Sequence, residues 1–374
     1  MENYDEMKIL FYCGGFAPIG GIETLAKNLL SYLKAKHHSC TLLCWGQKSP
    51  LFKSIQEVRV TTIRSPWRWG CKWNVPDWIL LPTGLKQIQQ ADVVLFGKLF
   101  PLQLLKQIRV QAGARKCLVF ITPYQPISPE HTVEKTHLLE ALNIFDLIIV
   151  QSSSFVNDLQ NIGYKGQIEV IPYIPHNYST IQPFPLKEKL KIGFLGRLVE
   201  DKNIPLLLTT FRIFCNKYSE NFSFSEQPSL HIFGDGHLRQ QLENLVQKLD
   251  IKSNVIFHGG ILNSQVEDAI ASCHLFAFTS RIEGQCLAAL EILSCGRPIV
   301  ATNAGALPDI LSDSRLGRLV KSAHPEDFAN HLIEIVKSIH EQSITPEIIR
   351  AAYLERYEPK RVGERYLEIL KSLT

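Results

Sequence analysis

Two carboxylates eight positions apart, Glu283 and Glu291, are the residues whose types and spacing most clearly indicate a binding site. From residue 285 to 295 the small and aliphatic side chains lie almost all round a helix, so we expect a buried helix after the apolar strand at 275–278. Glu291 falls in the middle of that helix, where an ionised carboxylate without a partner would be strongly unfavourable. A polar ligand is one candidate partner, and a neighbouring backbone group is the other.

Glu283 is expected in the loop before this helix, where Gly284 lets the backbone approach a ligand closely. If Gln285 begins the helix, its free N–H groups and the positive end of the helix dipole form an anion site. The two carboxylates then bracket that site at roughly 12 Å, at about 1.5 Å of rise per residue. This separation suits a nucleotide-sugar, with one carboxylate near the ribose and the other near the sugar hydroxyls. For the pair of glutamates alone, a purely structural role for Glu291 is an equally good interpretation.

A second group of charges follows the strand expected at residues 191–195. Gly196, Arg197 and Lys202 come directly after it. Two basic side chains at a strand end can hold a diphosphate, Arg through its planar donor fork and Lys as a point charge. Such a pair alone is more often solvated surface, but the fold that we expect places it at the same cleft as the two glutamates.

The elements that must position these residues alternate between short apolar strands and helices. In the first half we expect strands at residues 8–13, 41–45, 58–63, 93–96, 117–121, 147–150 and 168–171, with helices at 22–36, 84–90, 100–111 and 132–145. In the second half we expect strands at 191–195, 230–233, 255–257, 275–278, 298–301 and 317–320, with helices at 204–218, 238–249, 265–272 and 285–295.

This alternation predicts an α/β fold with two doubly wound, Rossmann-like domains, each a mostly parallel sheet with helices on both faces. Ligands of such sheets bind at the carboxyl ends of the strands, so we expect the site in the cleft between the domains. Gly20 and Gly21 lie in the glycine-rich loop after the first strand. They fit a close approach of backbone to phosphate or sugar, and also a flexible surface loop.

Proline-rich, polar sequence between residues 172 and 189 marks the domain boundary. We therefore assign residues 1–172 to the first domain, 173–190 to a linker and 191–355 to the second domain, with a final helical segment at 356–374. The tail from residue 346 is expected to be helical with a break at Pro359.

The composition restricts the class of protein. With 374 residues, 45% hydrophobic and 20% charged, the chain is an ordinary globular protein of about two domains. A net charge of +4 favours a phosphate-bearing partner weakly and does not indicate nucleic acid. The nine cysteines are scattered without metal-ligand spacing, so we expect reduced thiols and no metal site.

No apolar run approaches the length of about eighteen residues that a membrane span needs. The acidic start of the chain is unlike a secretion signal. We expect a cytoplasmic protein, with peripheral contact at the inner face of the membrane as a further expectation.

Four motifs follow one another in the second half: GRLVEDKN, IFGDGHL, VIFHGGI and SRIEGQCLAALEILSCGRPIVATNAGALPDIL. Together with Gly20-Gly21-Ile22-Glu23 near the amino terminus, they resemble the retaining family 4 glycosyltransferases of the two-domain GT-B fold. The resemblance spans nearly the whole chain and is densest from residue 191 to 311. It implies an acceptor-side first domain, a nucleotide-sugar-binding second domain and a carboxyl-terminal helix that crosses back to the first domain.

The resemblance also implies residue roles. Glu283 would contact hydroxyls of the donor sugar and Glu291 the ribose, while Arg197 and Lys202 would hold the diphosphate. Backbone groups near Gly259 would read the base. The substrate-binding positions that it implies are Gly20, Gly21, Gly196, Gly234, Gly259, Ile261, Gly284, Gln285, Cys286 and Leu287. From the residues alone, the Gly234-Asp235-Gly236 loop is a turn, since the third glycine of a dinucleotide fingerprint is missing.

The sequence departs from the family pattern after the strand at residues 117–121. Many family members carry a histidine there that helps to place the donor sugar, whereas this chain has Thr122-Pro123-Tyr124-Gln125. Tyr124 or Gln125 is the candidate substitute. The departure leaves a non-catalytic binder of sugar nucleotides open as an alternative.

Four of the five tryptophans lie in one basic segment from residue 64 to 78. Tryptophan beside arginine and lysine suits a membrane interface and equally a platform for a sugar or lipid-linked acceptor; a packing loop is the structural alternative. The acceptor or membrane candidates in this segment are Trp67, Arg68, Trp69, Lys72 and Trp73.

The sequence thus predicts a retaining, metal-independent transferase that needs no cofactor. It would move a hexose from a nucleoside diphosphate sugar, with UDP-glucose as the first candidate, to a glycan or lipid-linked acceptor. Three alternatives remain open at this point: a UDP-sugar epimerase or isomerase of the GT-B fold, a sugar-nucleotide binder without activity, and a membrane-docked interaction module.

Overall fold

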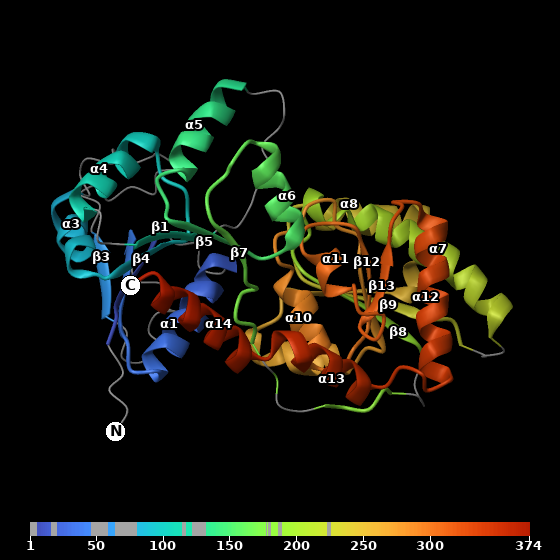
Figure 1. Cartoon of the computed structure of the whole chain (residues 1–374). Coiled ribbons are helices and arrows are strands. Elements are labelled where there is room, and N and C mark those ends of the chain that lie inside the picture. Colours follow the sequence, from blue (N-terminus) through green and yellow to red (C-terminus); the bar gives the residue numbers. More distant parts are fainter. Residues whose placement is uncertain are drawn as a thin grey trace. The chain divides into compact units, whose positions relative to one another are not determined.

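The computed structural model describes residues 6–15, 21–45, 59–63, 81–113, 117–121, 132–176, 178, 181–185, 189–222 and 226–374. Contacts divide the chain into two compact units (Figure 1). One unit contains Met1–Ile174 and Pro359–Thr374, and the other contains Pro175–Glu358.

The first unit contains a seven-stranded sheet with the order β3-β2-β1-β4-β5-β6-β7, in which all neighbours are parallel. Its strands are β1 (Lys8–Gly15), β2 (Ser39–Trp45), β3 (Arg59–Ile63), β4 (Val93–Phe96), β5 (Cys117–Ile121), β6 (Leu147–Val150) and β7 (Ile168–Val170). All seven predicted strands are confirmed. Strands of a parallel sheet are buried on both faces, so they form the nearly continuous apolar runs that the sequence displays.

Helices of the first unit are α1 (Gly21–Ala35), α3 (Leu81–Gln90), α4 (Leu102–Ala112), α5 (Thr132–Leu142), α6 (Ser153–Asn161) and α14 (Pro359–Ser372). The sequence analysis missed α6, whose first turn is capped by the Ser152 hydroxyl accepting the Ser154 N–H at 3.1 Å.

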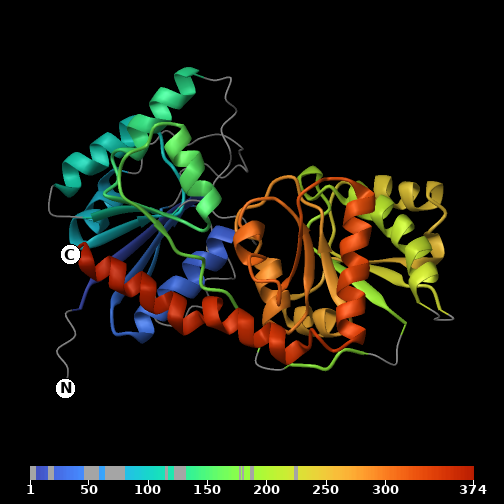
Figure 2. The same cartoon turned by 45° about the vertical axis from the view of Figure 1, so that its right-hand side comes forward.

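The carboxyl-terminal helix α14 packs on the first unit, as the fold prediction expects. It lies beside α1 in both views (Figures 1 and 2). The Arg365 guanidinium donates to the Val170 carbonyl at 2.9 Å, and Glu364 pairs with Lys36 at 3.8 Å. The helix α13 (Pro346–Tyr357) ends just before Pro359, so the predicted break is confirmed.

The second unit contains a six-stranded parallel sheet with the order β10-β9-β8-β11-β12-β13. Its strands are β8 (Lys191–Leu195), β9 (Ser229–Phe233), β10 (Val255–Gly259), β11 (Leu275–Phe278), β12 (Ile299–Thr302) and β13 (Gly317–Val320). All six lie where the sequence predicts strands. Because β8 and β11 are neighbours, the segments that follow them emerge side by side at one edge of the sheet.

Helical segments of the second unit are η2 (Glu200–Lys202), α7 (Ile204–Asn221), α8 (Arg239–Lys248), η3 (Lys252–Asn254), η4 (Asn263–Gln265), α9 (Val266–Ala271), α10 (Leu287–Ser294), α11 (Leu307–Ile310), α12 (Pro325–His340) and α13. Figure 2 shows the sheet of this unit with helices on both faces. The sequence analysis missed α12, although Pro325 and two acidic residues in its first turn are typical helix-start signals.

The segment expected to be a linker, residues 173–190, packs largely into the second unit. Tyr178, Phe184 and Leu190 belong to its hydrophobic core. The fully buried Arg297 binds this segment: its guanidinium donates to the carbonyls of Gln182 at 2.8 Å and Pro183 at 3.0 Å. Arg297 also donates to two other backbone carbonyls, so hydrogen bonds satisfy its buried charge.

Candidate active site

Glu283 lies in the loop that joins β11 to α10. The helix begins at Leu287, because Cys286 adopts a left-handed backbone conformation (φ 56°, ψ 65°) that a right-handed helix cannot include. The prediction that Gln285 begins the helix is therefore wrong. The separation of Glu283 from Glu291, which assumed helical rise throughout, loses its basis for the same reason. The free N–H groups at the start of α10 begin at Leu287.

Lys202 and Glu283, which are 81 positions apart in sequence, form an ion pair. Lys202 ends the short helix η2 after β8, and its Nζ lies 2.5 Å from Oε1 of Glu283. The Ser280 hydroxyl donates to the same oxygen at 2.7 Å. The two charged side chains are 20% and 6% exposed, so the extra hydrogen bond offsets part of the desolvation of the carboxylate. Two of the three predicted catalytic residues thus meet in one place.

The loop after β12, at residues 305 and 306, packs against the backbone of the Glu283 loop. The Ala306 N–H donates to the Gly284 carbonyl at 3.0 Å. Gly305 has a φ of 53°, and a β-carbon there would lie 2.1 Å from the Glu283 carbonyl oxygen. The sequence analysis did not assign a role to this loop. An Asn-Ala-Gly turn after a strand was the available signal, and it does not reveal what the turn touches.

Arg197, the third predicted catalytic residue, lies on the loop between β8 and η2 and is exposed. Within the described residues it has no hydrogen bond or ion pair. Its guanidinium therefore keeps all its donors for a ligand, whereas the Lys202 ammonium has three donors and uses one on Glu283.

Gly196, Gly234 and Gly259 come together at the carboxyl ends of β8, β9 and β10. The Gly234 N–H donates to the Gly259 carbonyl at 2.8 Å, and a β-carbon on Gly234 would lie 1.8 Å from the Gly196 carbonyl oxygen. Gly234 is therefore required by the close approach of its backbone to that of Gly196, whereas Gly259 has a φ of 77°, which favours glycine. Whether they also approach a nucleotide stays a prediction, and so does the role of the partly buried Ile261.

Glu291 lies one turn into α10 in a different environment. In the described part of the chain no donor bonds to its carboxylate, and burial raises its pKa from 4.5 to about 7. The Tyr178 and Tyr353 rings are near: burial raises the pKa of each phenol, and the Glu291 charge raises it further. The backbone donor that the sequence analysis names as one possible partner of Glu291 is thus not found among the described residues.

Several predicted positions lie outside the described residues. They are Gly20, the histidine substitutes Tyr124 and Gln125, and the acceptor or membrane candidates Trp67, Arg68, Trp69, Lys72 and Trp73. Gly21 is the first residue of α1. Gln285 and Cys286 follow Glu283 directly in the chain, and both are buried. The loop after β12 is the part of the site to which the sequence analysis gave no role.

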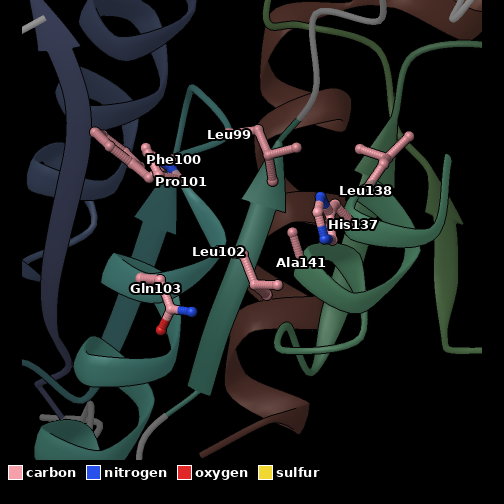
Figure 3. A pocket seen from close by; sticks show the side chains of 8 residues that line it. All are labelled: Leu99, Phe100, Pro101, Leu102, Gln103, His137, Leu138 and Ala141. Atoms are coloured by element: carbon pink, nitrogen blue, oxygen red, sulfur yellow. The ribbon is translucent and has the colours of Figure 1, made fainter. Parts of the chain in front are cut away.

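The first unit also contains a hollow of about 450 Å³ (Figure 3). It lies between the start of α4 and the middle of α5 and is mainly apolar, lined by Leu99, Phe100, Pro101, Leu102, Gln103, His137, Leu138 and Ala141. None of the predicted site residues lines it. It therefore adds no chemistry to the Lys202–Glu283 site.

Among the described residues, no three His, Cys, Asp or Glu side chains gather as metal ligands would. The same described residues include no helix with both the length and the apolar character of a membrane span. The expectation of a metal-independent reaction stays a prediction.

Comparisons with known proteins agree with the fold and with the motifs. The family model described as "Glycosyl transferases group 1" matches residues 179–348, and "Glycosyltransferase Family 4" matches residues 19–173. The chain is 23% identical over 216 residues to a poly(ribitol-phosphate) alpha-N-acetylglucosaminyltransferase of Staphylococcus aureus, covering 58% of this chain and 40% of that protein. It is 28% identical over 243 residues to an alpha-monoglucosyldiacylglycerol synthase of Streptococcus pneumoniae, covering 60% of this chain and 52% of that protein.

Among solved structures, Anabaena HepE in complex with UDP-glucose superposes with a TM-score of 0.73 at 20% identity, covering 98% of this chain and all of that one. The fold and the matched models define the class of protein as a glycosyltransferase with the GT-B fold. Within that class, the chain belongs to the glycosyltransferases that resemble family 4, as the motifs predict. The matched segments span about half or less of the two curated relatives, so substrates and products remain to be argued for this chain.

Proposed function

We propose that this protein is a retaining glycosyltransferase that moves a hexose from UDP-glucose to a glycan or lipid-linked acceptor in polysaccharide or glycolipid synthesis. The observation that carries the proposal is the buried Lys202–Glu283 pair; the exposed Arg197 lies on the same segment after β8 as Lys202. A carboxylate that can accept sugar hydroxyls beside an ammonium that can bind a diphosphate supports the proposal.

The reaction that these groups suit is group transfer with a diphosphate leaving group. The bond between the anomeric carbon and the diphosphate oxygen breaks, and the acceptor oxygen forms the new glycosidic bond. The diphosphate takes the electron pair and the proton of the acceptor hydroxyl. Arg197 and Lys202 stabilise the charge that develops on the departing oxygen, and the N–H groups at the start of α10 add to this.

Glu283 orients the donor sugar in this proposal. Its Oε1 already accepts from Lys202 and Ser280, so the remaining oxygen is the one available to sugar hydroxyls while Lys202 stays in place. A diphosphate that attracts Lys202 frees the first oxygen as well. Glu291 binds the ribose, and that contact supplies the hydroxyl donors that its carboxyl group lacks.

The choice of UDP-glucose rests on two likenesses. The Anabaena structure was solved with UDP-glucose, and the Streptococcus pneumoniae relative is named as a glucosyl lipid synthase. The acceptor class follows from the names of the two curated relatives, one for a poly(ribitol-phosphate) and one for a lipid. Retention of anomeric configuration is proposed from the resemblance to family 4.

The test is release of nucleoside diphosphate from a panel of UDP-, GDP- and ADP-sugars, without added metal. We expect release from UDP-glucose above all, abolished in Glu283→Ala and unchanged in Glu341→Ala, a matched change of an exposed glutamate. A donor that binds but stays intact with every acceptor offered would support the non-catalytic binder instead. Equal turnover by Glu283→Ala and the wild type would refute the assigned site.

A further inference from the structure

Two buried threonine hydroxyls bond to the backbone around the Lys202–Glu283 pair, one at the Lys202 turn and the other at the start of the Glu283 loop. Thr279, directly after β11, donates its hydroxyl proton to the carbonyls of Lys202 and Asn203, each 3.1 Å away. Thr302, the last residue of β12, donates to the Ser280 carbonyl at 2.6 Å. Thr279 has no exposed surface, so its hydroxyl bonds only to the protein.

The turn that presents Lys202 needs such support because its backbone is unusual. Asn203 adopts a left-handed conformation (φ 46°, ψ 45°) between η2 and α7. Residues other than glycine adopt this conformation at an energetic cost, which surrounding contacts must offset. Thr279 binds this turn at the carbonyls of Lys202 and Asn203, and the Arg281 N–H binds it at the Asp201 carbonyl at 2.8 Å.

We propose that Thr279 is a positioning residue for the transfer reaction, whose hydroxyl fixes the turn at residues 201–203 so that the Lys202 ammonium meets Glu283 and the donor diphosphate. Thr279 touches no substrate in this role and acts through Lys202. The inference rests on the proposed function, because it assigns Lys202 to the diphosphate.

The chain offers matched variants. Thr279→Val removes the hydroxyl and keeps the shape of the side chain, whereas Thr279→Ser keeps the hydroxyl. Thr210→Val is the control: Thr210 is also fully buried, lies in α7, and its hydroxyl has no hydrogen-bond partner within the described residues. Replacing a hydroxyl that bonds nothing should leave the site unchanged.

The measurements are kcat and KM with UDP-glucose and the affinity for UDP by calorimetry. For Thr279→Val we expect a loss of about tenfold in kcat/KM and in UDP affinity, because the support of one hydrogen bond is lost. Thr279→Ser should recover to within about twofold of the wild type, and Thr210→Val should equal it. In a Lys202→Met background, Thr279→Val should cause less than about twofold further loss, since the two residues act as one unit.

Two results would overturn the inference. One is a Thr279→Val enzyme that equals Thr210→Val in both kcat/KM and UDP affinity. The other is a full tenfold loss in the Lys202→Met background, which would show that Thr279 does not act through Lys202. Should Thr279→Val not fold, Thr279→Ala removes the same hydroxyl and takes its place in every comparison.

Failure of the proposed function gives a different pattern. If no UDP-sugar is turned over, or if Glu283→Ala turns it over like the wild type, the function falls. The UDP affinities of Thr279→Val, Thr279→Ser and Thr210→Val then still decide the role of Thr279.

Discussion

The two glutamates that the sequence pairs by spacing lie in opposite environments. Glu283 is deeply buried, yet its carboxylate accepts from an ammonium and a hydroxyl at 2.5 and 2.7 Å. Glu291 is held on a rigid helix among apolar and aromatic groups, and burial raises its pKa to about 7. The Glu283 carboxylate thus has two donors on one of its oxygens before any ligand arrives, whereas no donor among the described residues bonds to the Glu291 carboxylate.

This difference separates two ways in which a protein can prepare a carboxylate for a ligand. Glu283 is preorganised as an anion, so a sugar hydroxyl meets an acceptor that is already charged and oriented. Glu291 is held close to the point where it changes charge, so a ligand with hydroxyl donors would favour its ionised form. The same residue type serves both arrangements because the neighbouring side chains differ.

The largest effect that would sharpen this contrast is expected for Glu283→Gln. The substitution keeps the shape of the side chain but removes the charge opposite Lys202, so we expect kcat to fall by about 10²–10³-fold. Steady-state release of UDP measures it, with Glu341→Gln as the exposed control. A fall of less than about tenfold would show that the charge of Glu283 is dispensable for the reaction.

A somewhat smaller effect is expected for Gly305→Ala. This substitution changes neither glutamate but displaces the loop that carries Glu283. The new β-carbon would lie 2.1 Å from the Glu283 carbonyl oxygen, and Gly305 already has a φ of 53°. We expect a loss of about 2–3 kcal/mol in the free energy of unfolding, with kcat reduced while Glu291 is undisturbed.

Chemical denaturation measures that loss, and Gly260→Ala is its matched control. A β-carbon on Gly260 meets no atom within 4 Å, so its stability should stay within about 0.5 kcal/mol of the wild type. Equal stability of the two variants would mean that the Glu283 loop is not held against Gly305.

Glu291→Gln tests whether the buried Glu291 carboxylate lacks donors, and the free energy of unfolding is the quantity that reports it. The pKa of Glu291 is about 7 in the folded chain and near 4.5 otherwise, so between these values the folded state binds the proton more tightly. Wild-type stability from this group is therefore fully present below about pH 4.5 and falls as the pH rises to about 7. Glutamine does not titrate, so the variant should be more stable than the wild type by up to about 3 kcal/mol at pH 8 and equal to it near pH 4.5.

Urea unfolding at the two pH values measures this difference. Glu341→Gln, an exposed change of the same type, should show no such pH dependence. A destabilised Glu291→Gln at pH 8 would show that the ionised carboxylate has donors in the ligand-free protein, and the contrast with Glu283 would fail.

Much of the fold could be predicted because its signals are local. Buried parallel strands are apolar runs, and all thirteen predicted strands exist. The meeting of Lys202 and Glu283 was implied by their places after strands, since carboxyl ends of parallel strands share one edge. By contrast, α12 (Pro325–His340) was not predicted, although its start signals, a proline and two acidic residues in the first turn, are in the sequence.

The supports of the site could not be predicted, because they depend on contacts between distant segments. Nothing in the sequence indicates that Thr279 bonds the carbonyls of residues 202 and 203, or that Arg297 binds the carbonyls of 182 and 183. The left-handed Cys286 hid the true start of α10, since cysteine is not a residue type that signals this conformation. Residue identity predicted the chemistry of the site, and tertiary contacts determine its geometry.

The smallest expected effect concerns the affinity for the donor. If Glu291 binds the ribose as a carboxylate, its pKa of about 7 makes the dissociation constant for UDP-glucose pH-dependent. The constant should decrease about tenfold from pH 6 to pH 8, as the ionised fraction of Glu291 rises. UDP-glucose suits this calorimetric test better than UDP because its diphosphate has no terminal group that titrates in this range. Glu291→Gln should bind UDP-glucose more weakly and without the pH dependence. A wild-type affinity that stays constant from pH 6 to pH 8 would mean that Glu291 has the purely structural role that the spacing of the two glutamates also allows.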